Sequence, residues 1–396
     1  MIAPQEIVAR ARALHRTQVS WRREFHAHPE LSDQEVRTTA YLRKKLKAFG
    51  CKILSIDLAT GVLAELNGNG SGPIIAIRSD IDALPVLEQT GLSFKSKQPG
   101  VMHACGHDMH MATVLGAAAM LSDARKSFAG KIRFIFQPSE EMPPGGARPM
   151  IENGALDGAA RIFGLHVDPL VPTGKIGLRD GATMAAVLDF DLIVKGKGGH
   201  AARPHNAVDA IVAATEVVQS IQTIVSREFD PIEPVVITFG QIRGGTARNV
   251  IADEVRLVGT ARTLSESTYR RIPSAIKRTA MAVSRARGAK CEMQVIAGYP
   301  VLRNDAATNR LYRESYTALF GNGKVVTTEA VLGGEDFACY LEKVPGAMFR
   351  LGVRNKQLKA DQPWHSSRFM VDEQALIYGT SLLVAATLNY LDTHTR

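Results

Sequence analysis

The spacing of apolar residues predicts helices and strands in alternation along the first part of the chain. Residues 4–26 and 37–50 have the periodicity of helices, and Gly50 provides a stop for the second one. A buried strand over residues 74–78 runs into an acidic loop, and residues 109–124 form an Ala- and Leu-rich helix. The segment KIRFIFQ, which begins at Lys131 and is rich in apolar residues, forms another strand. This alternation is typical of an α/β domain.

The pattern changes to a period of two from about Met184. Residues 187–200 and 234–244 alternate apolar and polar positions, and helices are predicted at 207–225 and near 266–288. After about residue 300 the α/β character returns, with helices and the strand-like segment 346–353. The sequence therefore predicts a domain over 1–183 and 300–396 that is interrupted by an α+β insert over 184–299.

The composition is that of a folded protein with enough apolar residues for two cores. The chain has 396 residues, of which 45% are hydrophobic and 22% are charged. No segment offers the roughly 20 apolar residues that a membrane span requires. The four cysteines lie far apart and form no CxxC pair. We therefore expect a cytoplasmic protein in a reducing compartment, with no membrane partner.

The formal net charge of +9 raises the hypothesis of nucleic-acid binding. Lysines and arginines are scattered, however, and no basic segment is interleaved with aromatic residues as in a base-stacking surface. We therefore expect no nucleic-acid partner, and interpret the positive charge as an attraction for anionic substrates.

The segment GVMHACGHDMHM, residues 100–111, gathers several groups that can bind metal ions. In an extended chain, residues two apart point the same way, so Cys105 and His107 converge on one ion only if the segment is a loop and not a helix. Asp108 is interpreted as the cap of the helix that follows. Lone histidines are more often packed or hydrogen-bonded behind a ligand, so His103 and His110 are left out of the ligand set.

Further acidic and imidazole groups follow predicted strands. Glu140 and Glu141 come directly after one strand, and although such a pair is usually solvated, here one carboxylate can bind metal while the other takes a proton from water. With His166 and His365, the chain offers five nitrogen, oxygen and sulfur donors, enough for two ions that share a bridge, for which the Cys105 thiolate is a candidate. Ligands gather beyond the carboxyl ends of strands in such sheets, where we place Asp80, Asp82, Glu140, Glu141 and His166.

Two acidic pairs have less certain roles in the sequence. Asp82 is interpreted as a group that holds a ligand imidazole in its binding tautomer, although hydrogen bonding within a loop turn is the alternative for Asp80 and Asp82. Glu335 and Asp336 precede a predicted helix and are interpreted as caps.

Nine segments, in order along nearly the whole chain, resemble one enzyme family. They are FHAHPELS, RSDIDALP, GVMHACGHDMH, FQPSEE, GGARPMIENG, GKGGHAARPH, NVIADEVRLVGTART, GGEDF and HSSRF. The chain resembles the amidohydrolase branch of the binuclear metallo-aminoacylase and carboxypeptidase superfamily. Its members include hippurate hydrolases, N-acyl-amino-acid amidohydrolases and auxin-conjugate hydrolases.

The resemblance implies a zinc-aminopeptidase-like catalytic domain, with a mixed sheet flanked by helices, interrupted by a smaller lid domain that commonly mediates dimerisation. The family's metal ligands fall on Cys105, His107, Glu141, His166 and His365, and its general base falls on Glu140. Two divalent ions are implied, with Zn or Mn favoured and Co or Ni also compatible with the donors. A homodimer or higher homo-oligomer is expected.

The resemblance also assigns residues of the lid. The lid histidine of the family falls on His200, which would donate to the oxyanion of the tetrahedral intermediate. Without the resemblance, His200 would be interpreted as part of a polar loop beside a glycine turn. The family's substrate-binding positions fall on Asn249 and Arg262. The planar guanidinium of Arg262 matches a substrate carboxylate, although a structural ion pair is an equal alternative for this residue.

The chain departs from the family pattern at three positions. Ala210 and Ala252 stand where the family commonly has proline, which should alter rigidity more than chemistry. Met111 replaces a small or hydroxyl residue next to the metal-binding loop and is expected to reshape the substrate pocket.

The predicted function is hydrolysis of the amide bond of N-acyl amino acids by a metal-bound water, with Glu140 as general base. The alternative enzymatic function is that of a metallo-carboxypeptidase or dipeptidase that acts on short peptides. A metal-binding regulatory or storage protein that lost turnover is a further alternative, which the retained Glu140 argues against.

Overall fold

The computed structural model describes residues 2–296 and 298–394, which form two compact units. The first unit comprises the chain up to Gly181 together with Arg303–Glu329 and the residues from Asp336 onward. The second unit comprises Ala182–Leu302 and Ala330–Glu335. The two main crossings lie two or three residues from the predicted limits of 183 and 299, but the return of 330–335 to the second unit was not predicted.

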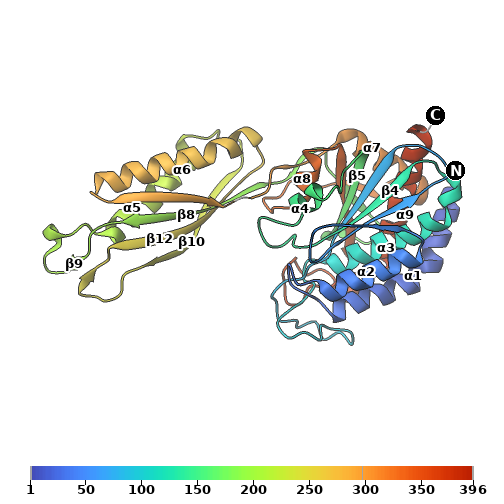
Figure 1. Ribbon diagram of the computed structural model, residues 1–396, viewed down its shortest axis with the longest axis horizontal. Coiled ribbons are helices and arrows are strands. Elements are labelled where there is room, and N and C mark those ends of the chain that lie inside the picture. Colours follow the sequence, from blue (N-terminus) through green and yellow to red (C-terminus); the bar gives the residue numbers. More distant parts are fainter. Residues whose placement is uncertain (1, 297, 395–396) are drawn as a thin grey trace. The chain divides into compact units, whose positions relative to one another are not determined.

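The first unit is built on a mixed eight-stranded sheet flanked by helices (Figure 1). Its strands are β1 (Lys52–Leu54), β2 (Val62–Asn67), β3 (Ile74–Asp80), β4 (Lys131–Gln137), β5 (Ala159–Pro172), β6 (Ile176–Leu178), β15 (Val325–Thr327) and β16 (Gly346–Arg354). Their order is β1-β2-β4-β3-β5-β16-β6-β15. The four central strands β4, β3, β5 and β16 are parallel to one another. They are buried on both faces, which explains their nearly continuous apolar sequences.

Helices cover this sheet on both sides. They are α1 (Pro4–Ala27), α2 (Val36–Ala48), α3 (His107–Asp123), α4 (Ala147–Glu152), α7 (Ala306–Phe320), α8 (Phe337–Leu341) and α9 (Ala375–His394), with short 3-10 turns at Arg125–Ser127 and Lys356–Leu358. α1, α3 and α9 pack against one another on one side of the sheet, and α4 and α8 pack together on the other (Figure 1). α8 approaches β5 closely because Gly164 has no side chain: a Cβ there would lie 2.8 Å from the Phe337 ring.

The second unit is an antiparallel sheet with two helices on one face (Figure 1). Its strands are β8 (Ala186–Lys195), β10 (Val235–Gly244), β12 (Glu254–Thr263) and β13 (Lys290–Ile296), in the order β10-β12-β8-β13. The helices are α5 (Ala210–Arg227) and α6 (Glu266–Ala286). Two short pairs complete the topology: β9 (Gly199–His200) with β11 (Val250–Ile251), and β7 (Gly181–Met184) with β14 (Leu302–Asn304).

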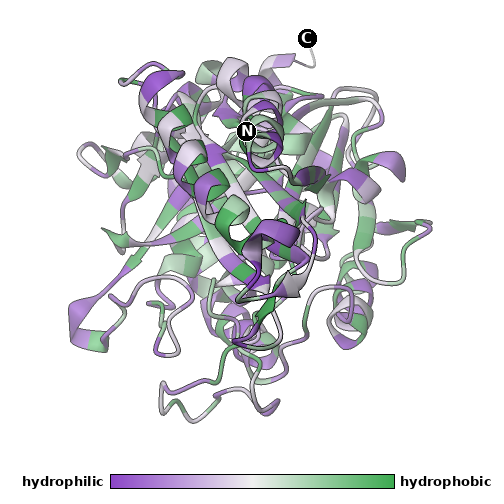
Figure 2. Cartoon of the chain, turned by 90° about the vertical axis from the view of Figure 1, so that its left-hand side faces the viewer, coloured by the Kyte–Doolittle hydropathy of each residue, from purple (hydrophilic) through white to green (hydrophobic). Residues whose placement is uncertain are grey.

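Alternating side chains make the core of the second unit. Leu188, Phe190, Leu192 and Val194 of β8 face the helices, where they meet apolar residues of α5 and α6. The period of two in the sequence therefore reports a sheet that is covered on one face only. Figure 2 shows the corresponding distribution, with much of the hydrophobic colour on strands and the hydrophilic colour on peripheral loops and helix turns.

The observed architecture confirms the predicted fold class, an α/β domain interrupted by a smaller α+β unit. Among the described residues, no helix is long and apolar enough to cross a membrane.

A buried ion pair joins β2 and β4 in the first unit. Glu65 and Arg133 lie directly opposite each other, and the Arg133 Nε donates to the Glu65 carboxylate at 3.2 Å. The same guanidinium donates to the carbonyl oxygens of Gly154 and Asp157 at 3.1 and 2.7 Å. Both side chains are buried, and without Arg133 the Glu65 carboxylate keeps only the half-exposed Lys131, whose Nζ lies 3.6 Å away.

We predict that Arg133→Met lowers the free energy of unfolding of the first unit by about 3 kcal/mol, because Glu65 loses its buried partner and keeps only the more exposed Lys131. Both tryptophans of the chain, Trp21 and Trp364, lie in this unit, so denaturant unfolding followed by tryptophan fluorescence measures it. The double variant Arg133→Met/Glu65→Leu should recover at least half of the loss. An unchanged unfolding midpoint in the single variant would contradict the role given to the pair.

Candidate metal centre

The predicted site residues of the first unit come together around the ends of three neighbouring parallel strands. Asp80 is the last residue of β3, and Glu140 and Glu141 follow β4 after a short turn. The prediction that His166 follows the end of a strand is wrong, because His166 lies within β5, a strand of 14 residues that continues to Pro172. It still reaches the site because β5 runs beside β3, parallel to it.

The metal-binding segment turns more sharply than the sequence suggested. The prediction of an extended loop across Cys105 and His107 is wrong: α3 begins at His107, and Gly106 adopts a left-handed conformation with φ of 90°. Glycine is required there, because a Cβ would lie 2.5 Å from Cγ2 of Val167. The turn at Gly106, and not strand alternation, therefore directs both side chains to one place.

The five predicted ligands form overlapping groups. The donor atoms of Cys105, His107 and His166 all lie within 4.8 Å of one another, as do those of Cys105, Glu141 and His365. The Cys105 Sγ lies 3.5 Å from the His166 Nε2, and the Glu141 Oε1 lies 3.9 Å from the His107 Nε2 and 3.4 Å from the His365 Nε2. Cys105 and Glu141 thus stand between the imidazoles, where ligands shared by two ions would be.

Two of the imidazoles are held in the tautomer that metal binding needs. The His107 Nδ1 donates to the carbonyl oxygen of Asp82 at 2.9 Å, and the His166 Nδ1 donates to its neighbour Val167 at 2.8 Å. Because a carbonyl oxygen can only accept, Nδ1 carries a hydrogen in each ring, and Nε2 is the nitrogen that faces the site. His110 differs, since its Nε2 accepts from the backbone N–H of Val167 at 2.9 Å. Its lone pair is therefore occupied.

His365 reaches the site through a strained backbone. It adopts φ of 64°, and its N–H donates to the carbonyl oxygen of Ala104 at 2.9 Å. This hydrogen bond ties the His365 loop to the loop that carries Cys105, although the two are far apart in sequence. His365 is also the most exposed of the five, with 54% of its side chain accessible.

The electrostatics of the site favour a cation. Burial would lower the pKa of His107, but the charges of Asp80 and Asp82 raise it to about 10. Burial and the charges of Glu141 and Glu140 raise the pKa of the Cys105 thiol well above its usual value, so only a nearby cation would make it a thiolate. Burial lowers the pKa of His166 well below its usual range, which keeps that imidazole neutral.

Buried polar atoms without hydrogen bonds show that the residues fit metal ions. The His107 Nε2 and the Glu141 Oε1 are both buried and lack a hydrogen-bond partner among the described residues. Such atoms are costly in a protein interior unless another ligand satisfies them. The mixed set of nitrogen, oxygen and sulfur donors suits Zn, Mn, Co or Ni.

Asp82 lies where a supporting residue is expected. Its Oδ1 lies 3.3 Å from the His107 Nδ1, and its Oδ2 accepts from the backbone N–H of Glu141 at 3.0 Å. Ser32 also donates to the Asp82 carboxylate at 2.8 Å. Asp82 therefore links the backbone of one predicted ligand with the ring of another.

Asp336 occupies the N-cap position of α8, as the sequence suggested, but its side chain makes no capping hydrogen bond there. Instead its carboxylate accepts from the Arg78 guanidinium at 2.8 Å and from the Gln137 amide at 2.6 Å. Arg78 also donates to Asp80 at 2.7 Å, so a fully buried arginine balances two buried carboxylates. A charged residue inside the apolar strand IIAIRSD was the sequence signal for this contact.

Behind the metal-binding segment lies a second buried network, which the sequence did not predict. Asp108 is not the N-cap of α3, which is Gly106; its carboxylate accepts from the Met109 N–H at 2.9 Å and from the Arg22 Nε at 2.7 Å. His26 contacts the same carboxylate through Nδ1 at 2.8 Å and Glu88 through Nε2 at 3.2 Å. His26 and Arg22 belong to α1, so the network fixes the start of α3 against that helix.

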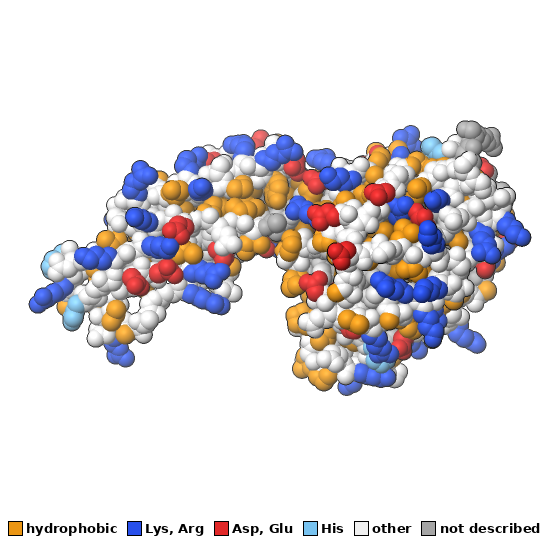
Figure 3. Space-filling model, viewed as in Figure 1, with side chains coloured by type: hydrophobic (Ala, Val, Ile, Leu, Met, Phe, Trp, Pro, Cys, Tyr) orange, Lys and Arg blue, Asp and Glu red, His pale blue; other side chains and the backbone are white. Residues whose placement is uncertain are grey.

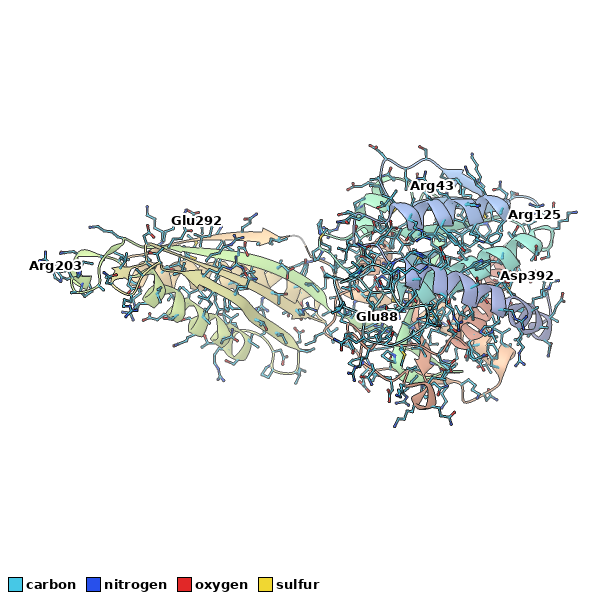
Figure 4. The ribbon with its side chains drawn as sticks, turned by 90° about the horizontal axis from the view of Figure 1, so that it is seen from below. Arg43, Glu88, Arg125, Arg203, Glu292 and Asp392 are labelled. Carbon is cyan, nitrogen blue, oxygen red and sulfur yellow. The ribbon has the colours of Figure 1, made fainter. Side chains whose placement is uncertain are left out.

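The other predicted residues lie in the second unit. His200 is exposed in β9, with its Nδ1 accepting from the Ala202 N–H at 3.1 Å. Asn249 is also exposed. It lies beside His200, because its carbonyl oxygen accepts from the Ala201 N–H and its neighbour Val250 pairs with His200. Arg203 projects from the same end of this unit (Figure 4). Arg262 lies apart on β12, where it donates to the carbonyl oxygen of Leu332 at 2.9 Å.

Comparisons with known proteins show the family to which the chain belongs. The pattern of peptidase family M20/M25/M40 matches residues 76–389. The chain belongs to this family. N-acetylcysteine deacetylase of Bacillus subtilis is 39% identical over 383 residues, which make up 96% of this chain and 99% of that protein. Thermostable carboxypeptidase 1 of Saccharolobus solfataricus is 39% identical over 362 residues, or 90% and 91% of the two chains.

A solved structure gives the same result. The Bacillus subtilis YXEP protein, described as a dinuclear metal binding peptidase from the M20 family, is 37% identical and has a TM-score of 0.83. The match covers 96% of this chain and 99% of that one. The predicted family is thereby confirmed, and this M20/M25/M40 protein is an amide hydrolase.

The network behind α3 generates a pH prediction. Burial would raise the pKa of the Glu88 carboxyl, but the hydrogen bond and charge of His26 lower it to about 2. A folded pKa below the unfolded value stabilises the protein above pH 4.5, and this stability is lost as the pH falls towards 2.

We therefore predict that Glu88→Gln lowers the free energy of unfolding at pH 7 by about 2 kcal/mol, after allowance for solvent screening. The difference from the wild type should shrink as the pH is lowered from 5 to 3, when denaturant unfolding is followed by tryptophan fluorescence. A difference that stays constant across this range would show that the Glu88 charge contributes nothing.

Proposed function

We propose that this M20/M25/M40 protein hydrolyses the amide bond of N-acyl amino acids with two divalent metal ions, Zn or Mn. Cys105, His107, Glu141, His166 and His365 would hold the ions. The observation that carries the proposal is the convergence of these five donors beside Glu140, with the His107 Nε2 and the Glu141 Oε1 buried and lacking a hydrogen bond. The similarity to an N-acetylcysteine deacetylase supports the substrate class, and the dinuclear relative supports the number of ions.

Glu140 acts as the general base. Its carboxylate lies within 4.8 Å of donor atoms of both His107 and Glu141, and only 7% of the residue is exposed. The bound ions would polarise the amide carbonyl and make the attacking water more acidic. Glu140 takes the proton from that water and then delivers it to the nitrogen of the leaving amine, which lets the carbon–nitrogen bond break.

Residues of the second unit complete the proposal. His200 donates to the oxyanion, where one positioned donor contributes about 3 kcal/mol to transition-state stabilisation. Asn249 and Arg262 bind the carboxylate of the substrate, and the guanidinium fork of Arg262 suits that anion. Arg262 has a structural contact as well, its hydrogen bond to Leu332, so its role needs a separate test. We propose the first unit as the catalytic domain, and the second as a lid that also mediates homodimerisation.

The surroundings of the thiols fit a reducing compartment. All four cysteines, including Cys105, are free and buried. A thiol that binds metal must stay reduced, so we propose a cytoplasmic location. Figure 3 shows Lys and Arg spread over the visible face with Asp and Glu between them, and no continuous basic stripe. This distribution favours a small anionic substrate over nucleic acid.

The alternative is a carboxypeptidase or dipeptidase that acts on short peptides, which the similarity to a thermostable carboxypeptidase favours. Both substrate classes present a carboxylate next to an amide, so the same donors serve either. The metal-loaded enzyme should be assayed with N-acetyl, N-benzoyl and indole-acyl amino acids and with dipeptides. A higher kcat/KM for any acyl amino acid than for all dipeptides supports the proposal, and the reverse order supports the alternative.

We predict that Glu140→Gln lowers kcat by at least about 10³-fold while two metal ions per chain are retained, because the side-chain amide of glutamine cannot take the proton from water. Steady-state kinetics and elemental analysis of the same preparation test this. Activity within tenfold of the wild type would show that Glu140 is not the base.

We predict that His200→Ala lowers kcat by about 10²-fold without a change in metal content, because one oxyanion donor is lost. The matched control is His205→Ala, which removes a second exposed histidine from the same loop. Equal activity of the two variants would remove His200 from the mechanism.

A further inference from the structure

We propose that Asp33 and Glu35 are positioning residues for Glu140: they hold Ser139 in a left-handed conformation that turns Glu140 and Glu141 into the same site. Both residues lie in the loop between α1 and α2, and Glu35 directly precedes α2. The inference rests on the proposed role of Glu140 as the base, and adds two residues that act on Glu140 through Ser139.

Every polar group of Ser139 is held. Its N–H donates to the Glu35 Oε1 at 2.9 Å, and its carbonyl oxygen accepts from the Gly146 N–H at 3.0 Å. Its hydroxyl donates to the Asp33 carboxylate and accepts from the Asp33 N–H at 2.8 Å. Ser139 is 5% exposed and Glu35 is fully buried. These contacts define the Ser139 clamp, which consists of Asp33, Glu35 and Ser139.

The clamp opposes an unfavourable backbone conformation. Ser139 has φ of 54° and Asp33 has φ of 63°, values that residues with a Cβ rarely adopt. Two such residues in mutual contact persist only where the surrounding structure enforces them. The hydrogen bonds of Glu35 and Asp33 provide that enforcement.

The left-handed turn has a direct consequence for the two glutamates. Successive side chains of an extended strand point to opposite faces, so a straight continuation of β4 would send Glu140 and Glu141 in opposite directions. In the structure, one oxygen of each carboxylate instead lies within 4.8 Å of the same ring nitrogen of His107. The turn at Ser139, one residue before Glu140, breaks the alternation.

The same loop also supports the far side of Glu140. Ser32, next to Asp33, donates to the Asp82 carboxylate, which accepts from the backbone N–H of Glu141. The loop therefore fixes the backbone on both sides of Glu140, directly at Ser139 and through Asp82 at Glu141. A displacement of the base by about 1 Å is enough to cost a large factor in rate.

Variants of Asp33 test the clamp at an exposed position where folding is not at risk. Asp33→Gly keeps the positive φ accessible but removes the carboxylate, whereas Asp33→Asn tolerates the same φ and keeps an acceptor for the Ser139 hydroxyl. We expect Asp33→Gly to lower kcat by about tenfold with KM and metal content unchanged, and Asp33→Asn to restore most of that loss.

Variants of Glu35 test the buried half. Glu35→Leu removes the acceptor for the Ser139 N–H and should lower kcat by about 30-fold, while Glu35→Gln keeps an acceptor and should recover most of it. The matched control is Glu30→Leu, since Glu30 lies in the same loop and accepts from the α2 backbone at Arg37 and Thr38 without touching Ser139. It should lower the melting temperature but leave kcat within about twofold.

The outcomes separate this inference from the proposed function. The clamp is supported if kcat falls in Asp33→Gly and Glu35→Leu and recovers in Asp33→Asn and Glu35→Gln. The control Glu30→Leu should show no such fall in kcat. If the wild type is active and Asp33→Gly keeps its full kcat, the clamp is wrong while the proposed function stands, even where Glu35→Leu fails to fold. A metal-loaded wild type that hydrolyses no amide in the substrate panel overturns the proposed function and the inference together.

Discussion

The structure depends on keeping several buried carboxylates charged at one edge of a sheet. Asp80 and Asp82 are fully buried and Glu140 nearly so, and each would be unstable as an anion in an apolar interior. Burial would raise the pKa of Asp80, but the charges of His107 and Arg78 and the hydrogen bond from His110 hold it well below its usual value. Arg78 balances one side of the cluster through Asp80 and Asp336. The other side faces the five proposed donors, where a pair of cations would complete the charge balance.

Backbone turns then convert this charge arrangement into a site. Gly106, Ser139 and His365 all have positive φ, and each lies at or next to a predicted ligand or the predicted base. In each case a contact from elsewhere in the chain accompanies the turn: Val167 closes on Gly106, Glu35 accepts from Ser139, and Ala104 accepts from His365. At Ser139 and His365, where a positive φ is locally unfavourable, tertiary contacts therefore maintain the conformation at the points where the chemistry is proposed.

Local patterns predicted what depends on local physics. The helices at 4–26 and 266–288 and the alternating strands of the second unit follow from apolar spacing, because one buried face imposes that spacing. The residue types offered five candidate donors, but their assignment as one ligand set came from the resemblance, since Cys105 and His365 lie 260 positions apart and no periodicity connects them. The turn at Gly106, the partners of Asp108 and Asp336, and the Ser139 clamp escaped prediction for a similar reason. Each joins segments whose proximity only the folded chain creates.

The most direct test of the central claim is anomalous X-ray diffraction from crystals of the protein loaded with Zn or Mn. The account predicts two peaks, one contacted by His107 and the other by His166, with Cys105 or Glu141 touching both and His365 completing the set. A single ion, or ions bound away from these five side chains, would contradict it.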